Sequence, residues 1–239
     1  NKASNIDLEK VEITFCNQLF WLYSDGSCYH ERSKTLIVAD LHLEKAFSQS
    51  SSTLLPGYDT TETLDLLTFA LNRNPVSRCI LLGDSFHTIQ AAQSLADIYK
   101  ERLKQLTMGR EFIWLYGNHD PLLPNFLFGA QSLSSCIGNI ELRHQIEESE
   151  TNNQLAPTDG QIIAHYHPKA KLRLRAGTAS GKCFIFDTCR MILPAFGVFT
   201  GGLNVRNKAI SSLFKTPPEI YFCHKTKLYH IRDVANLCK

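Results

Sequence analysis

The sequence predicts an α/β fold, a four-layer α/β/β/α sandwich of two mixed sheets lying between helices. Short apolar runs alternate with helical patterns in the first half of the chain, an order typical of a sheet covered by helices. The second half contains mostly strand-like segments, which predict a second sheet packed on the first so that each buries one face. A chain of 239 residues can bury a substantial core, and we expect one domain over residues 1–239.

Three apolar runs in the first half are predicted to be buried strands. They cover residues 35–39, 79–82 and 112–116 and are rich in aliphatic, β-branched and aromatic side chains. Continuous runs of this length are typical of strands buried on both faces.

Two helices are expected between these strands. Asp59 and Glu62 form a capping-box pattern, which predicts a helix that buries Leu64, Leu67 and Leu71. A second helix is expected from about residue 90 to residue 109. Its predicted inward side chains are Leu95, Ile98, Leu103 and Leu106.

The second half is expected to supply the other sheet. The predicted strands are residues 140–145, 161–164, 169–175, 182–187, 190–193, 220–223 and 227–231. Residues 176–181 contain two glycines and are expected to form a turn, and residues 47–56 and 147–160 are expected to form loops.

The charge balance leaves several classes of function open. The formal net charge is +2, from 25 basic and 23 acidic residues, and binding of nucleic acid depends more on a local patch than on this sum. No apolar run approaches the roughly 20 residues that a membrane span needs, and the polar beginning of the chain is unlike a signal peptide. We therefore expect a cytoplasmic protein with no membrane partner.

The eight cysteines include no CxxC pair and no zinc-ribbon spacing. Most lie inside apolar or strand-like runs, as Cys79 and Cys183 do. We expect buried, reduced thiols rather than a disulfide framework.

Side chains of the metal-ligand type recur where the apolar runs end. They are Asp40, His42, Asp84, Asn118, His165 and His167. The carboxyl ends of strands in an open α/β sheet meet at one edge, so these side chains should converge. Any one of them could instead cap a helix or a turn, but capping does not account for the whole set. Oxygen and imidazole donors without thiolate favour Mn²⁺, Fe or Zn²⁺ over a soft metal.

The order of these motifs resembles that of the calcineurin-like metallophosphoesterases. The family pattern is D-x-H, G-D, G-N-H-[DE], a lone His and G-H-x-H. The matching segments are Asp40-Leu41-His42, Gly83-Asp84, Gly117-Asn118-His119-Asp120, His144 and Ala164-His165-Tyr166-His167. The chain departs from the pattern at Ala164, where the family has glycine.

The resemblance implies the metallophosphoesterase fold and two divalent metal ions, Mn²⁺ in preference to Fe or Zn²⁺. The ligands implied for one ion are Asp40, His42 and His167. The ligands implied for the other are Asn118, His144 and His165. Asp84 would bridge both ions, and a hydroxide bridging the ions would attack a phosphoester.

The same resemblance implies that His119 stabilises or protonates the leaving oxygen. We expect the neighbouring Asp120 to orient the ring of His119; the alternative is that His119 only satisfies backbone groups of its turn. His87 is a candidate for contact with the substrate.

Longer motifs are similar to one bacterial branch, the ligase-associated DNA damage response endonucleases. The matching stretches are residues 39–46, 55–60, 83–87, 165–168, 194–197 and 200–203. The branch pattern places Glu-Pro after the lone histidine, where this chain has Gln145-Ile146. The resemblance implies a phosphodiester substrate in DNA, and a DNA ligase and a helicase- or nuclease-like protein as partners. The alternatives are a phosphomonoesterase or nucleotide hydrolase with the same metals, and a non-catalytic protein-binding scaffold.

A basic strand is predicted directly after the last pair of histidines. Lys169, Lys171, Arg173 and Arg175 alternate with apolar residues, so they should share one face. Lys169 and Lys171 are candidates for gripping a polyanionic substrate. The favoured interpretation is a solvated sheet face or a charged edge that opposes aggregation.

Overall fold

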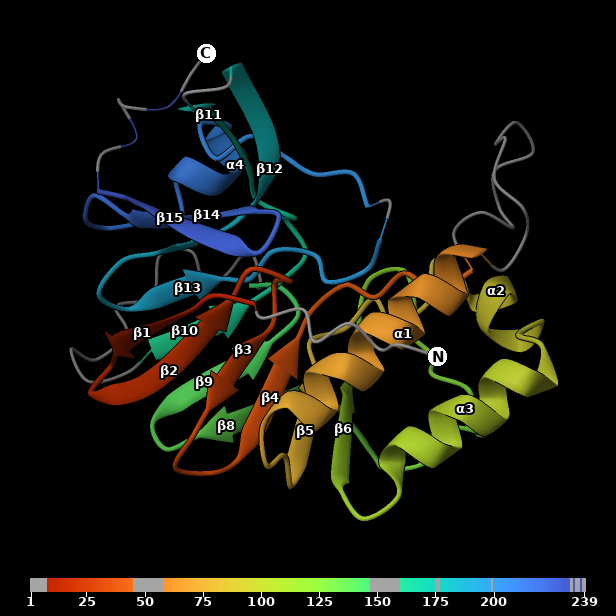
Figure 1. The fold of residues 1–239 in the computed structure, drawn as a ribbon. Coiled ribbons are helices and arrows are strands. Elements are labelled where there is room, and N and C mark those ends of the chain that lie inside the picture. Colours follow the sequence, from red (N-terminus) through yellow and green to blue (C-terminus); the bar gives the residue numbers. More distant parts are fainter. Residues whose placement is uncertain are drawn as a thin grey trace.

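The computed structural model describes residues 8–44, 58–146, 160–174, 177–198, 200–232, 234 and 237. Within these ranges, the chain forms two mixed β-sheets packed face to face, with helices on their outer sides (Figure 1). The predicted α/β/β/α sandwich is thus confirmed, although its fourth layer is thin because it contains the short helix α4 (Lys208–Ser211).

The first sheet carries the strands that precede most of the predicted ligands. Its spatial order follows the chain: β1 (Lys10–Phe15), β2 (Gln18–Tyr23), β3 (Cys28–His30), β4 (Thr35–Val38), β5 (Arg78–Leu81), β6 (Glu111–Leu115) and β7 (Ala130–Ser132). Neighbours from β1 to β4 are antiparallel, and those from β4 to β7 are parallel. The predicted buried strands correspond to β4, β5 and β6. Strands β1–β3 and β7 were not predicted from the sequence.

The second sheet is built from the second half of the chain. In chain order its strands are β8 (Ser134–Ile137), β9 (Ile140–Arg143), β10 (Gly160–Ile163), β11 (Lys169–Leu174), β12 (Gly177–Phe186), β13 (Arg190–Ile192), β14 (Glu219–His224) and β15 (Lys227–Ile231). The spatial order is β15-β14-β12-β13-β10-β9-β8, with β11 paired to β12. β10 lies parallel to both β9 and β13.

The structure tests the expected turn but not the two expected loops. The expected turn at residues 176–181 is wrong from Gly177 onward, because these residues form the start of β12 and pair with β11. The stretches 47–56 and 147–160 lie outside the described residues, except for Gly160, which begins β10.

Helices α1 (Tyr58–Arg73), α2 (Ile89–Gln93) and α3 (Asp97–Thr107) cover the outer face of the first sheet. The first predicted helix is confirmed as α1. The second is divided into α2 and α3, because the chain leaves the helical conformation between Ser94 and Ala96. The break changes the direction in which α3 presents its side chains. Ile98, expected inside, is consequently 74% exposed, whereas Leu103 and Leu106 are buried.

Apolar side chains between the two sheets form the central core. It includes Phe20, Ile37, Ile162 and Phe184, each fully buried. Burying an aliphatic or aromatic side chain of this size stabilises a fold by about 1.5–3 kcal/mol. Ala164, at a position where the similar motif of the calcineurin-like metallophosphoesterases has glycine, also packs in this cluster, so the fold accommodates its methyl group.

The described cysteines are free thiols. Cys28, Cys79, Cys183 and Cys223 are buried, as expected, whereas Cys136 is exposed. Burial raises the pKa of the Cys28 and Cys79 thiols well above their usual range, which makes these groups inert rather than nucleophilic.

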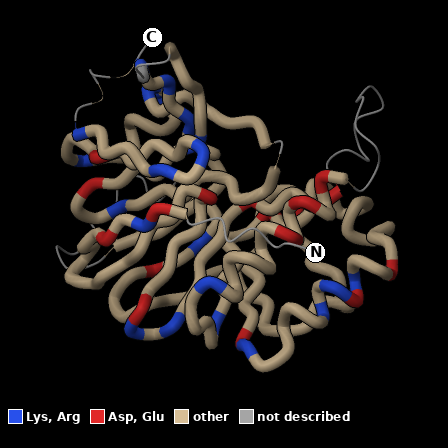
Figure 2. Tube along the Cα trace, in the orientation of Figure 1, with Lys and Arg blue, Asp and Glu red and all other residues tan. Residues whose placement is uncertain are grey.

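Charged residues are interspersed along the chain, as Figure 2 shows. The described helices lack the length and apolar character that crossing a bilayer would require.

Candidate functional site

The predicted ligands converge where the carboxyl ends of β4, β5 and β6 face the ends of β9 and β10. Asp40 and His42 follow β4, Asp84 follows β5 and Asn118 follows β6. Main-chain hydrogen bonds align the first two segments: the N–H of His42 donates to the carbonyl of Asp84 at 2.9 Å. The second sheet contributes His144 after β9 and His165 and His167 after β10. The sheet-end placement predicted from the sequence is therefore observed.

One cluster consists of Asp40, His42 and His167. One ligand atom from each lies within 4.8 Å of the other two. The Nε2 atoms of His42 and His167 are 3.2 Å apart, and His167 Nε2 lies 3.5 Å from Asp40 Oδ2. Two imidazole nitrogens directed at the same point as a carboxylate oxygen form a suitable donor set for a divalent transition metal.

The second cluster contains Asp84, His144 and His165, again with ligand atoms within 4.8 Å of one another. Asn118 adds an amide oxygen, because its Oδ1 lies 2.9 Å from His144 Nε2 and 2.7 Å from His165 Nδ1. Asp84 lies between the clusters: its Oδ2 is 3.3 Å from His144 Nε2 and 3.9 Å from His42 Nε2. Asp84 can therefore reach both groups.

Hydrogen bonds behind the clusters hold the side chains in place. His144 Nδ1 lies 2.8 Å from the carbonyl oxygen of Leu82. A carbonyl can only accept, so Nδ1 carries the hydrogen and Nε2 faces the cluster. The N–H of His119 donates to Asp84 Oδ1 at 2.8 Å, which leaves Oδ2 directed at the histidines. Partners of this kind fix ring orientation and tautomer in metal centres.

The backbone at these ligands adopts a conformation that most residues avoid. Five of the seven predicted ligands have positive φ angles: Asp40 (51°), His42 (46°), Asp84 (46°), His165 (72°) and His167 (45°). Gly83, with φ of 75°, also lies so close to His144 that an added Cβ would be 2.6 Å from the ring Nδ1. Non-glycine residues with positive φ are uncommon and concentrate at functional sites, where the surrounding structure holds them.

The pKa values of the histidines differ between the two clusters. Burial lowers the pKa of His42 to about 3, despite the opposing influence of Asp40. The ring is therefore neutral near pH 7, the form that donates a lone pair to a metal. Burial also opposes charge on His144 and Asp84, but their mutual interaction prevails, raising the pKa of His144 to about 9 and lowering that of Asp84 to about 2. The ring of His144 is therefore protonated near pH 7, and an ion bound at its Nε2 would take the place of that proton.

One buried oxygen provides a test of whether metal ions fit. Asp40 Oδ1 has no hydrogen-bond partner among the described residues. A buried polar atom without a partner destabilises a protein unless something else satisfies it. Together with the neutral ring of His42 and the donor set, this atom shows that the residues present fit divalent cations.

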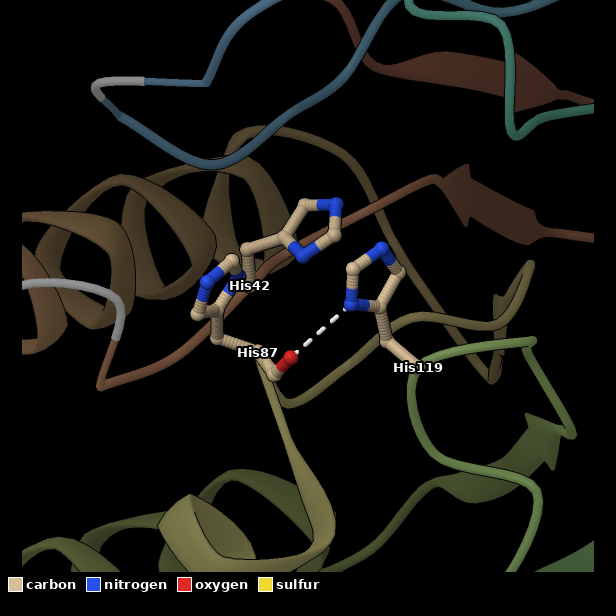
Figure 3. A group of neighbouring side chains, drawn as sticks. All are labelled: His42, His87 and His119. Carbon is tan, nitrogen blue, oxygen red and sulfur yellow. Dashed lines mark hydrogen bonds between the residues drawn. The ribbon is translucent and has the colours of Figure 1, made fainter. Parts of the chain in front are cut away.

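Three histidines gather beside the first cluster. Figure 3 shows His42, His87 and His119 facing one another from three different loops. The rings of His87 and His119 stack with centroids 5.4 Å apart, and His119 Nδ1 lies 3.0 Å from the carbonyl of His87. The ring of His119 is therefore held by this carbonyl, and Nδ1 is the nitrogen that carries the hydrogen.

The expected role of Asp120 requires a correction. Its buried carboxylate accepts hydrogen bonds from the backbone N–H groups of Gly117, Asp84 and Phe86, at 3.0–3.1 Å. Burial is the main reason that its pKa rises to about 7. Asp120 thus joins the turns after β5 and β6 rather than orienting the ring of His119.

Three of the predicted basic residues, Lys169, Lys171 and Arg173, lie on β11, close to His167 in sequence. Arg175 lies outside the described residues. Lys169 Nζ donates to the carbonyl of Thr200 at 2.9 Å, so its ammonium group fastens a loop. Lys171 is exposed. Lys169 is therefore not a free cation beside the predicted ligands.

Sequence reasoning missed a set of residues beside the second cluster. Tyr116, Pro121, Leu133 and Arg143 line a pocket together with Asn118 and His144. Their proximity to predicted ligands in the sequence could have revealed two of them. Tyr116 directly precedes Gly117-Asn118, and Arg143 directly precedes His144.

Comparison with known proteins identifies a solved structure with the same architecture. No protein-family model and no curated protein matches this sequence. The structure entitled "Crystal structure of Pseudomonas putida nuclease MPE" matches with a TM-score of 0.71 and 24% sequence identity, over 93% of this chain and 100% of that chain. The chain therefore has the fold of this nuclease.

Proposed function

We propose that this protein is a metal-dependent phosphodiesterase that hydrolyses DNA. The observation that carries the proposal is the convergence of seven carboxylate, amide and imidazole side chains into two adjoining clusters, with Asp84 within 4 Å of histidines from both. Paired clusters of this composition are typical of two-metal phosphoesterases.

Each cluster would hold one divalent ion. Asp40, His42 and His167 would bind the first; Asn118, His144 and His165 would bind the second, with Asp84 shared. Bound ions would activate a water molecule as nucleophile and neutralise charge on the phosphoryl oxygens. The mixture of oxygen and imidazole donors supports Mn²⁺, with Fe and Zn²⁺ as alternatives.

The ring of His119 would act on the leaving oxygen. Its Nδ1 is engaged with the carbonyl of His87, so Nε2 is the atom that can carry a proton toward the substrate. His119 is exposed, while its main chain is fixed through Asp84 Oδ1. This combination of solvent access and a fixed backbone suits a residue that donates a proton to a departing alkoxide.

Two similarities support DNA as the substrate. The sequence motifs resemble those of ligase-associated DNA damage response endonucleases, and a protein with the same fold is a nuclease. On the same basis, we propose a DNA ligase and a helicase- or nuclease-like protein as functional partners.

The test compares a diester with a monoester. Protein freed of metal with a chelator and then supplied with Mn²⁺ is assayed on bis-p-nitrophenyl phosphate and on p-nitrophenyl phosphate. We expect Mn²⁺-dependent hydrolysis of the diester that is lost in Asp84→Ala. Asp97→Ala is the matched control, because Asp97 is an exposed carboxylate on α3 that pairs only with Lys100 among its described contacts. It should retain full activity.

The other outcomes identify other functions. Preference for the monoester would replace the proposal with a phosphomonoesterase or nucleotide hydrolase. Folded, metal-loaded protein that hydrolyses neither ester nor DNA would indicate a binding scaffold.

A further inference from the structure

A pocket of about 430 Å³ opens beside the second metal cluster. Its walls come from both sheets: Tyr116 follows β6, Leu133 lies between β7 and β8, and Arg143 ends β9. Asn118 and His144 belong to the pocket and to the cluster at once. A molecule whose phosphate lies on the metal centre would therefore extend directly into this pocket.

The pocket combines apolar faces with one cation. Leu133 is 74% exposed, and Pro121 is also exposed. Tyr116 is half-buried, and its backbone N–H donates to the carbonyl of Ser132 at 3.0 Å, which fixes the main chain from which the ring projects. A lining of apolar and aromatic side chains with a few polar groups is typical of pockets that bind small molecules.

Arg143 supplies the polar part of the wall. Its side chain is 14% exposed, and its Nε lies 3.7 Å from Glu141 Oε1. This ion pair holds the guanidinium beside the pocket. A planar guanidinium can donate to ring nitrogens and carbonyl oxygens or stack on a flat ring.

We propose that this pocket binds a nucleoside that flanks the scissile phosphate; this inference rests on the proposed function. A nucleobase presents two apolar faces and a polar edge, which match Leu133, Pro121 and Tyr116 on one side and Arg143 on the other. A purely apolar pocket would suit an alkyl ester, and a purely cationic one would suit a second phosphate. The mixed lining favours a nucleotide diester over both.

The pocket is tested by equilibrium binding, which does not depend on turnover. The probe is a thymidine dinucleotide joined by a nuclease-resistant phosphorothioate, titrated into Mn²⁺-loaded protein by calorimetry. Dimethyl phosphorothioate, which has the same linking group without nucleosides, is the comparison ligand. We expect the dinucleotide to bind at least about tenfold more tightly, because stacking of one base contributes roughly 1–3 kcal/mol.

The informative variant is Leu133→Asp, which places a charge on the pocket rim at an exposed position where folding is not at risk. It should raise the Kd of the dinucleotide about tenfold. Ile98→Asp is the matched control, since Ile98 is equally exposed at 74% and lies on α3, and it should leave the Kd unchanged. Equal affinities for the two ligands, or a Kd unaffected by Leu133→Asp, would overturn the inference.

Hydrolysis of bis-p-nitrophenyl phosphate distinguishes this failure from failure of the proposed function. If that hydrolysis is absent but Leu133→Asp weakens dinucleotide binding, the catalytic proposal fails and the pocket assignment stands. If hydrolysis is present but binding is insensitive to Leu133, the catalytic proposal stands and the pocket assignment fails.

Discussion

At the scale of single residues, Gly117 shows how tightly the candidate centre is assembled. A Cβ at this position would overlap the backbone nitrogen and side chain of Asp84, and it would also lie 2.7 Å from Asp120 Oδ1. These two carboxylates are fixed by hydrogen bonds, so neither can move aside without losing a backbone partner. Gly117 is thus required by the close approach of two loops.

We predict that Gly117→Ala displaces Asp84 and lowers kcat on bis-p-nitrophenyl phosphate at least about 100-fold, because small misplacements of reacting groups have effects of this size. Metal content per chain, measured by mass spectrometry, should fall in parallel. Gly201→Ala is the control, since no atom lies within 4 Å of its added Cβ. Full metal loading and activity in Gly117→Ala would contradict this account of the site.

His119 allows a second prediction, on leaving groups. If its Nε2 protonates the departing oxygen, His119→Asn should slow cleavage of a dinucleotide by about 10²–10⁴-fold, the range for general acid catalysis. The effect on bis-p-nitrophenyl phosphate should be much smaller, because p-nitrophenolate leaves without a proton. Measured kcat values on the two substrates give the ratio. Equal losses on both would assign His119 to positioning alone.

At the scale of elements, the break between α2 and α3 determines which side chains of this region reach the core. Thr88 begins α2 by accepting the N–H of Ala91 at 3.0 Å, and Ser94 ends it. α3 then starts without a side-chain cap at Ala96. Within α3, Leu103 contacts the core whereas Ile98 points to solvent.

We predict that Leu103→Ala lowers the free energy of unfolding by about 2–5 kcal/mol, as expected for a buried leucine. Ile98→Ala should change it by less than about 0.5 kcal/mol. Urea denaturation followed by circular dichroism provides both values. A large loss from Ile98→Ala would instead support one continuous helix with Ile98 inside.

The same elements show which features of a sequence reveal structure. The strands β4, β5 and β6 were predictable because continuous apolar runs are buried on both faces. β1 was not, because exposed and buried residues alternate along it and Lys10 and Glu12 interrupt the apolar signal. β3 and β7, with three residues each, are too short for periodicity to detect.

The candidate site was predictable to a different degree. Six of the seven ligand-type side chains follow predicted strand ends, so the rule that such ends converge was enough to group them. His144 lies inside the predicted strand 140–145, and only the family resemblance pointed to it. The contacts of Asp120 and the pocket around Leu133 were not predictable, because they depend on which loops meet in space. Sequence adjacency alone misassigned Asp120 to the ring of His119, whereas the fold joins it to backbone N–H groups after β5.

At the scale of the whole molecule, the candidate centre connects the two sheets. Asp40, Asp84 and Asn118 follow strands of the first sheet, while His144 and His165 follow strands of the second. Ions held by these residues would link the layers, in addition to the apolar core between them. Metal binding should therefore stabilise the entire fold.

We predict that removing the metals with a chelator lowers Tm and that Mn²⁺ restores it. A ligand present at 100 times its Kd stabilises the folded state by about 2.7 kcal/mol, which corresponds to roughly 5–10 °C for a chain of this size. Scanning calorimetry of Asp84→Ala provides the control, because its Tm should respond weakly to Mn²⁺. An identical Tm with and without metal in the unsubstituted protein would exclude this role of the ions.

The left-handed backbone at Asp40, His42, Asp84, His165 and His167 limits how this centre can change in evolution or by design. Asn, Asp and His are the non-glycine residues that best tolerate such φ angles, and they are also oxygen and nitrogen donors. Exchanges among these three at the five positions would alter the charge and hardness of the donor set while the loops keep their shape. Valine, isoleucine or threonine would be excluded by the main chain before any metal chemistry is considered. The loops therefore restrict the centre to a few types of side chain. Exchanges among these types could change which metal ion binds without changing the fold.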